Sequence, residues 1–256
     1  MIKQTSLLRL WVPVIILATL AAIIALSGSN KSLFLSLNKL SEGAPVMFWA
    51  TATLLADAAT GFALMTLALR KHSKLIYWAI MGGILCAVVI RIIKVGANLP
   101  RPAGILSIDD FQVIGKAITS KSFPSGHTAT AFFVAAIVTG FHQSRWLLIG
   151  SLLVASILAF SRIAVGVHWP IDVCIGAIIG WSIGILTVRF AQNSKALSQK
   201  QHWFAIAICL TGSVIFLSMD FHLPDIDVIQ YSIGIICLIT GLTTAYLEFR
   251  QPRDAV

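Results

Sequence analysis

Charged residues are scarce in this chain of 256 residues. They make up 11% of it, against about 25% in soluble domains. A soluble fold with so little charge would expose large apolar patches and aggregate. Because 57% of the residues are apolar, we expect lipid to be the solvent for much of the surface. The sequence also has no internal repeat, no low-complexity tract and no soluble domain, which leaves one membrane domain with room for a small addition.

Two further absences restrict the function. The four cysteines, Cys86, Cys174, Cys209 and Cys237, lie far apart in apolar runs without a CxxC pair, which favours buried free thiols over ligands or disulfides. The formal net charge of +9 would suggest nucleic acid in a soluble protein, but no basic stripe is interleaved with aromatic residues. The bases lie mostly in short loops, where they orient helices and meet anionic headgroups. We therefore expect a lipid bilayer and no nucleic acid as a partner.

Long apolar runs predict an all-α, polytopic membrane helical bundle. A helix needs about 20 residues to cross about 30 Å of hydrocarbon. Eight runs approach this length, near 10–27, 45–69, 75–96, 125–142, 146–163, 170–190, 203–219 and 228–247. The first run is longer than the apolar region of a signal peptide, so we expect an uncleaved helix there.

The distribution of bases between the loops predicts an orientation. One side carries Lys3, Arg9, Arg70, Lys71, Lys74, Arg145, Arg189, Lys195, Lys200, Arg250 and Arg253. The other side carries Lys31, Lys39, Lys116 and Lys121, leaving aside three bases that we assign to a site. Since Lys and Arg are enriched in cytoplasmic loops, we expect both termini in the cytoplasm. The opposite loops would then face the periplasm, across a bacterial inner membrane.

Three segments on that outer side carry polar residues that a membrane topology alone does not require. They contain Lys94, Arg101 and Pro102; Pro124, Ser125, Gly126 and His127; and Ser161, Arg162, His168 and Asp172. The cations Lys94, Arg101 and Arg162 repel one another unless an anion lies among them, and the planar fork of arginine suits phosphate oxygens. Ser125 and Gly126 open a helix, where free backbone N–H groups and the helix dipole favour an anion. Together these residues predict a phosphate-binding site.

The spacing of His168 and Asp172 predicts a nucleophile. Four residues apart, they share a helix face, so the carboxylate can hold one imidazole nitrogen while the other attacks phosphorus. His127, from another helix, would protonate the departing oxygen and later accept a proton from water. The cations supply the charge stabilisation that phosphoryl transfer needs, so we expect neither a metal nor another cofactor. A helix-capping pair is the simpler alternative for His168 and Asp172, and headgroup anchoring is the alternative for the arginines.

The three segments resemble the signature of the type 2 phosphatidic-acid phosphatase and vanadium haloperoxidase superfamily, K-x6-RP, PSGH and SR-x5-H-x3-D. Every signature position is present. The resemblance implies the same residue roles and a six-helix core over roughly residues 10–190. We accordingly expect a phosphatase core over 1–192 and two additional C-terminal transmembrane helices over 193–256.

The activity that the resemblance implies is hydrolysis of a lipid phosphate or pyrophosphate through a phospho-histidine. Polyprenyl pyrophosphate, phosphatidylglycerol phosphate, phosphatidic acid and lipid A are all compatible substrates. A lipid phosphotransferase using the same intermediate and a non-enzymatic lipid transporter remain as alternatives. A haloperoxidase is disfavoured because those members of the superfamily are soluble.

Two segments outside the motifs carry expectations of their own. Asp57 lies near the middle of the second apolar run, where an unpaired charge is costly. We predict that it pairs with Arg91 beneath the phosphate site; bonding to neighbouring hydroxyls is the alternative. Residues 31–40 are predicted to form a short helix in the membrane interface, or else an ordinary loop.

Three loops complete the expectations. The long loop 103–123 is typical of a functional segment, and we expect it to dip into the interface and admit substrate through Phe111, Val113 and Ile114. His202 is expected to be solvated in an inner loop. The acidic loop 220–227 is either a divalent-cation site or, more simply, a hydrated loop.

Overall fold

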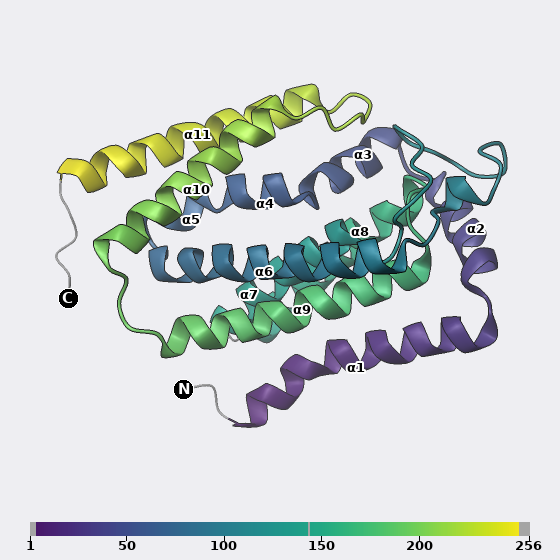
Figure 1. The fold of residues 1–256 in the computed structure, drawn as a ribbon, viewed down its shortest axis with the longest axis horizontal. Coiled ribbons are helices and arrows are strands. Elements are labelled where there is room, and N and C mark those ends of the chain that lie inside the picture. The colour runs from purple at the N-terminus through teal and green to yellow at the C-terminus, as the bar shows by residue number, and fades with distance from the viewer. Residues whose placement is uncertain (1–3, 143, 251–256) are drawn as a thin grey trace.

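The regular structure is helical throughout residues 4–142 and 144–250, the residues described by the computed structural model (Figure 1). Within these described residues, six helices are long and apolar enough to cross a membrane: α1 (Gln4–Ser27), α6 (Ser73–Ala97), α8 (Arg145–Ala164), α9 (Pro170–Asn193), α10 (Gln199–Ser218) and α11 (Asp227–Arg250). A bent segment adds a seventh if it counts as one span: α3 (Val46–Leu55), α4 (Ala58–Leu64) and α5 (Thr66–Leu69). The shorter α7 (Gly126–His142) has 17 residues. These elements match the eight expected ranges and confirm the all-α membrane bundle.

The helices run along the long axis of the molecule, and the two ends of the bundle differ. Helix α1 begins and α11 ends at one end, whereas the loop between α6 and α7 lies at the other (Figure 1). Large apolar side chains such as Leu26, Val228 and Phe249, exposed by 90%, 79% and 77%, cover the outside, which suits contact with lipid. Lys3 and Arg253, two of the bases used to predict the orientation, lie outside the described residues.

Small residues on α9 let this helix lie directly against α7. Gly176, Gly180 and Gly184 follow one another at intervals of four, so they share one face of α9. A Cβ added at Gly176 would collide with the carbonyl oxygen of Ser125, and one at Gly180 with that of Ala129. The close contact holds the start of α7, with the second polar segment, beside the start of α9, where the third polar segment ends.

The short helix α2 (Asn30–Ser41) lies across the loop end of the bundle. The buried Asn38 donates to the carbonyl oxygen of Ile163, at 2.9 Å, and accepts from the backbone N–H of Gln112, at 2.8 Å. The helix predicted for this segment therefore forms. Phe34 is fully buried inside the protein, whereas Leu40 on the same face is 71% exposed. Only part of this face is therefore open to lipid, and its placement in the membrane interface stays a prediction.

The long loop between α6 and α7, which includes the short η1 (Pro102–Gly104), is also packed inward. Phe111 and Ile114 are only 8% and 4% exposed. The ring of Phe111 lies 5.2 Å from that of Phe34, and Val113 packs against the same cluster. The prediction that these residues dip into the interface and admit substrate is wrong, because Phe111 and Val113 pack beneath α2 and Ile114 packs in a core cluster with Trp49 and Val165.

The second expected span is not one straight helix. Between α3 and α4 the axis bends by 67°. Asp57 stands at the bend as the N-cap of α4, and its Oδ1 accepts the backbone N–H of Ala59 at 2.7 Å. The bend lets a carboxylate lie within a span without being buried in hydrocarbon on all sides.

The C-terminal helices α10 and α11 pack against the α4–α5–α6 side of the bundle. A Cβ at Gly212 of α10 would lie 2.7 Å from the Cβ of Phe62 on α4. His202 is 4% exposed and its Nε2 lies 3.1 Å from Glu248 Oε1, so the prediction that it is solvated is wrong. The four cysteines are free and buried, as predicted.

Candidate active site

His168 and Asp172 form a buried pair at the loop end of the bundle. His168 lies in the turn between α8 and α9, with its Nδ1 3.3 Å from Asp172 Oδ2. The same oxygen accepts the backbone N–H of Trp169, at 2.9 Å, and the hydroxyl of Ser122. Because the carboxylate faces Nδ1, it favours the tautomer with a proton there, and Nε2 keeps its lone pair.

Local sequence explains why this pair forms. Pro170 occupies the first position of α9, where its missing N–H costs nothing. Asp172 is then the third residue of the helix, and its side chain accepts the backbone N–H of Trp169, the residue just before the helix, as in a capping box. The backbone N–H of Ser125 donates to the carbonyl oxygen of Asp172 at 3.0 Å, which ties the second polar segment to the third.

Two of the predicted cations are held in place by backbone carbonyl groups. Near the end of α6, Lys94 donates to the carbonyl oxygen of Lys121 at 3.0 Å. Arg101 donates from Nε to that of Ser120, at 2.9 Å, and from Nη1 to that of Val167, at 3.1 Å. These bonds fix the guanidinium while leaving it N–H groups for an anion.

The third cation, Arg162, has an unused donor. The residue is 6% exposed, and its buried Nε has no hydrogen-bond partner among the residues that the structure describes. An unsatisfied buried N–H is costly, and a charged one aimed into a site suits an oxyanion.

The electrostatics of His168 show that these groups converge on one imidazole. Burial lowers the pKa of His168 well below its ordinary value of 6.5, and Arg101, Arg162 and Lys94 lower it further, as does His127. The ring is therefore held neutral, which is the state in which nitrogen can act as a nucleophile. The structure thus brings the cations and both histidines to one place, while Ser125 and Gly126 lie at the start of α7.

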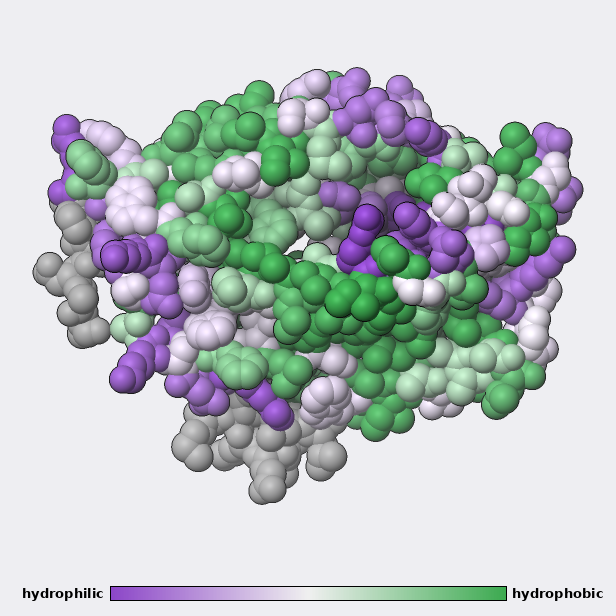
Figure 2. Space-filling view, viewed as in Figure 1, coloured by the Kyte–Doolittle hydropathy of each residue, from purple (hydrophilic) through white to green (hydrophobic). Residues whose placement is uncertain are grey.

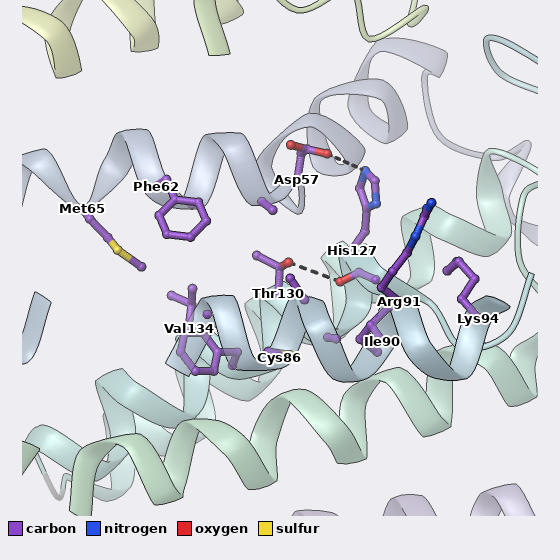
Figure 3. A pocket seen from close by; sticks show the side chains of 17 residues that line it. Asp57, Phe62, Met65, Cys86, Ile90, Arg91, Lys94, His127, Thr130 and Val134 are labelled. Carbon is purple, nitrogen blue, oxygen red and sulfur yellow. Dashed lines mark hydrogen bonds and ion pairs between the residues drawn. The ribbon is translucent and has the colours of Figure 1, made fainter. Parts of the chain in front are cut away.

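The partner of Asp57 differs from the one we predicted. Its Oδ2 lies 3.3 Å from Nε2 of His127 (Figure 3), and no ion pair with Arg91 forms in the described part of the chain. The predicted Asp57–Arg91 pair is wrong, because the bend before α4 brings the carboxylate of Asp57 to His127 on α7. Arg91 nevertheless lines the same cavity as both residues.

This cavity, of about 290 Å³, joins polar and apolar surfaces. Its polar end is lined by Asp57, Arg91, Lys94 and His127, and its apolar part by Phe62, Met65, Gly83, Phe133 and Val134. Figure 3 shows Phe62, Met65 and Val134 extending away from the polar end between α4 and α6. On the surface, a hollow with hydrophilic side chains at its rim is flanked by hydrophobic side chains (Figure 2).

The loop groups that hold the site together could not be recognised from the sequence. Ser122 is fully buried against Asp172, yet a serine in a long loop carries no distinguishing pattern. Ser120 and Lys121 act through carbonyl groups, which every residue has. In the acidic loop 220–227, Asp220 pairs with His222 at 2.8 Å, and both are exposed.

A helical membrane bundle with a neutral histidine among three cations is an arrangement that suits a bound phosphate. Residues 73–196 match the family model of the PAP2 superfamily. The chain therefore carries a PAP2 superfamily domain, which spans α6 to α9 and contains the three polar segments. The resemblance noted in the sequence is confirmed.

Named relatives match over short stretches. The chain is 37% identical over 71 residues to undecaprenyl-diphosphatase of Sulfolobus acidocaldarius, covering 28% of this chain and 34% of the relative. It is 36% identical over 78 residues to phosphatidylglycerophosphatase B of Escherichia coli K12, covering 29% and 31%. For lipid A 1-phosphatase of Porphyromonas gingivalis the identity is 43% over 72 residues, covering 26% and 16%. The matches thus span well under half the length of these relatives.

Two solved structures share the architecture. LpxE of Aquifex aeolicus is 28% identical, with a TM-score of 0.55, over 62% of this chain and 94% of that chain. A transmembrane PAP2 type phosphatidylglycerolphosphate phosphatase of Bacillus subtilis is 19% identical, with a TM-score of 0.54, over 73% and 100%. The second likeness concerns the fold alone.

Proposed function

We propose that this protein is a metal-independent phosphatase that hydrolyses a lipid phosphate or pyrophosphate through a phospho-histidine at His168. The observation that carries the proposal is the unpartnered buried Nε of Arg162 beside an imidazole whose other nitrogen is held by Asp172. An anion among the cations would satisfy that donor and lie within reach of the nucleophile.

The residues suggest a two-step reaction. With the phosphate bound by Lys94, Arg101 and Arg162, the Nε2 lone pair of His168 attacks phosphorus and the bond from phosphorus to the lipid oxygen breaks. His127 gives the leaving oxygen a proton. Water then attacks phosphorus and returns its proton to His127, the P–N bond breaks, and inorganic phosphate leaves. The cations and the N–H groups at the start of α7 stabilise the charge that develops on the phosphoryl oxygens.

The apolar part of the cavity supports a lipid as the substrate. A phosphate at the polar end, near Lys94 and His127, would place an attached chain between α4 and α6, along Phe62 and Met65. Polyprenyl pyrophosphate, phosphatidylglycerol phosphate, phosphatidic acid and lipid A all combine such a headgroup with such a chain. The relatives are named as phosphatases of three of these substrate classes: a polyprenyl diphosphate, phosphatidylglycerol phosphate and lipid A. The loop charges favour a periplasmic site in a bacterial inner membrane, with both termini in the cytoplasm.

Phosphate release by the purified protein in detergent with EDTA tests this function. We expect wild type to release phosphate from at least one of these lipids and His168→Ala to lose at least about 10³-fold, because the nucleophile is gone. His222→Ala, in the exposed outer loop, serves as a matched control and should keep wild-type activity. Acid-labile, alkali-stable label on wild type but not on His168→Ala would identify the intermediate.

Other outcomes would change the assignment. If His168→Ala released phosphate like wild type, the covalent mechanism would be wrong. Labelled phosphate appearing on an acceptor lipid instead of in solution would identify a phosphotransferase. A folded protein with no turnover of any lipid, and with lipid movement unaffected by the substitution, would identify a transporter.

A further inference from the structure

The Asp57–His127 contact joins two elements that are far apart in the sequence. Asp57 Oδ2 lies 3.3 Å from His127 Nε2, and the two side chains are 16% and 29% exposed. Both line the cavity, together with Lys94 (Figure 3). The pair therefore stands in the wall of the proposed substrate site and is open to it.

The positive charges around His127 explain why a carboxylate beside it would matter for proton transfer. The charged groups that line the cavity with His127 are Asp57 from the α3–α4 bend, and Arg91 and Lys94 from α6. Arg101 from the loop, Arg162 from α8 and His168 from the α8–α9 turn also interact with it electrostatically. Burial disfavours the charged form of the His127 ring, and Arg162, Arg101 and Lys94 repel a protonated ring further. A general acid must carry its proton before the reaction, so a neighbouring carboxylate is needed to offset those cations.

We infer that Asp57 is a positioning residue that keeps His127 protonated and oriented for proton transfer to the leaving group. Its carboxylate holds Nε2, which leaves Nδ1 as the nitrogen that exchanges a proton with the substrate. The arrangement mirrors the other pair, in which Asp172 holds Nδ1 of His168 and leaves Nε2 to attack. This inference rests on the proposed function, since it assumes that His127 is the general acid.

A second role of Asp57 has to be separated from this one. Its other carboxylate oxygen, Oδ1, caps α4 through the N–H of Ala59. Asparagine and serine are also good N-caps, so Asp57→Asn and Asp57→Ser preserve the start of the helix. Both remove the negative charge beside His127.

The test compares two substrates that differ in their need for an acid. The leaving group of an alkyl monophosphate is an alkoxide unless its oxygen is protonated. The leaving group of p-nitrophenyl phosphate is p-nitrophenolate, a stable anion that needs no proton. For Asp57→Asn we expect kcat with the alkyl substrate to fall about 10- to 100-fold, part of the usual contribution of general acid catalysis, with KM within about twofold. With p-nitrophenyl phosphate the loss should stay below about threefold. In the profile of kcat against pH with the alkyl substrate, the basic limb should move to lower pH by about one pH unit or more.

Matched variants keep the result interpretable. Asp220→Asn removes the same charge from an exposed Asp–His pair and should behave as wild type. Asp57→Glu should recover part of the alkyl activity and move the basic limb back up. If Asp57→Asn does not fold, Asp57→Ser takes its place.

Two results would overturn the inference. One is a basic limb that stays in place, and the other is an equal loss with both substrates, which indicates a merely structural role. Either could occur while His168→Ala and His127→Ala remain inactive, and the proposed phosphatase function would then stand. Activity in those two variants would instead refute the proposed function itself.

Discussion

Replacing Asp172 by asparagine gives a sharp test of how the proposed nucleophile is held. Three donors converge on one carboxylate oxygen of Asp172: the backbone N–H of Trp169, the hydroxyl of Ser122 and Nδ1 of His168. The backbone N–H cannot turn away, so the amide oxygen of asparagine, not its NH2 group, must occupy this position. The tautomer of His168 should therefore survive the substitution.

The expected loss then comes from charge alone. As the P–N bond forms, the imidazole becomes positive and its hydrogen bond to Asp172 becomes an ionic one. A hydrogen bond between charged groups is about twice as strong as a neutral one, and losing this gain costs about 2–3 kcal/mol. At about 1.4 kcal/mol per factor of ten, kcat should fall roughly 30- to 150-fold. Asp172→Ala removes the acceptor altogether and should cost about 10³- to 10⁴-fold, as loss of the orienting acid does in a triad.

Steady-state phosphate release at saturating lipid, with Tm recorded for each variant, measures the difference. KM should not rise in Asp172→Asn, because all three cations remain. Ser122→Ala, which removes one of the three donors, should lower kcat less than either Asp172 variant. A loss in Asp172→Asn as large as that in Asp172→Ala would refute the reasoning, because it would mean that the amide had reversed and imposed the wrong tautomer.

Three further predictions concern pH, helix packing and the cavity. Because burial and the nearby cations lower the pKa of His168, the ring stays neutral until the pH falls well below 6.5; the acid limb of the kcat/KM profile should lie there, and Lys94→Met should move it upward. Gly180→Ala places a methyl group against the carbonyl of Ala129, so it should lower the free energy of unfolding by about 1–3 kcal/mol and reduce turnover. Gly150→Ala, with open space around its Cβ, should change neither quantity. Gly83→Leu fills the apolar part of the cavity and should raise KM for long-chain substrates but not for p-nitrophenyl phosphate; an equal rise for both would show that the chain does not lie there.

The part of the site that the sequence predicts is the part built from local spacing. His168 and Asp172 lie four residues apart on one turn, and Pro170 between them marks where that turn begins. Their contact needs little more than a helix to start at this proline. The three cations were likewise recognisable, because Lys94 and Arg101 follow one span and Arg162 ends another at the same predicted face, and clustered positive charge favours a bound anion.

The part that the sequence does not predict depends on tertiary geometry. A straight helix over 45–69 would place Asp57 at a depth similar to that of Arg91, and the predicted pairing followed from that assumption. The bend replaces this geometry with an N-cap at Asp57. Asp followed by Ala-Ala-Thr is an N-cap signal, but an unbroken apolar run conceals it. The inward packing of Phe34 and Phe111 was hidden in the same way, because amphipathic segments beside a membrane can face either lipid or protein.

The two histidines thus depend on different features of the fold, and this separates their functions. His168 precedes α9 and is oriented by Asp172 in the first turn of that helix, so the proposed nucleophilic attack depends on local structure and on the contact of α9 with α7. His127 contacts a carboxylate that reaches it only through the bend between α3 and α4, outside the matched PAP2 domain. A change that straightens this bend should therefore impair proton transfer to the leaving group while leaving phosphate binding intact. In the proposed mechanism, attack on phosphorus uses residues of the matched domain, whereas protonation of the leaving group also relies on Asp57, in a helical segment that precedes that domain.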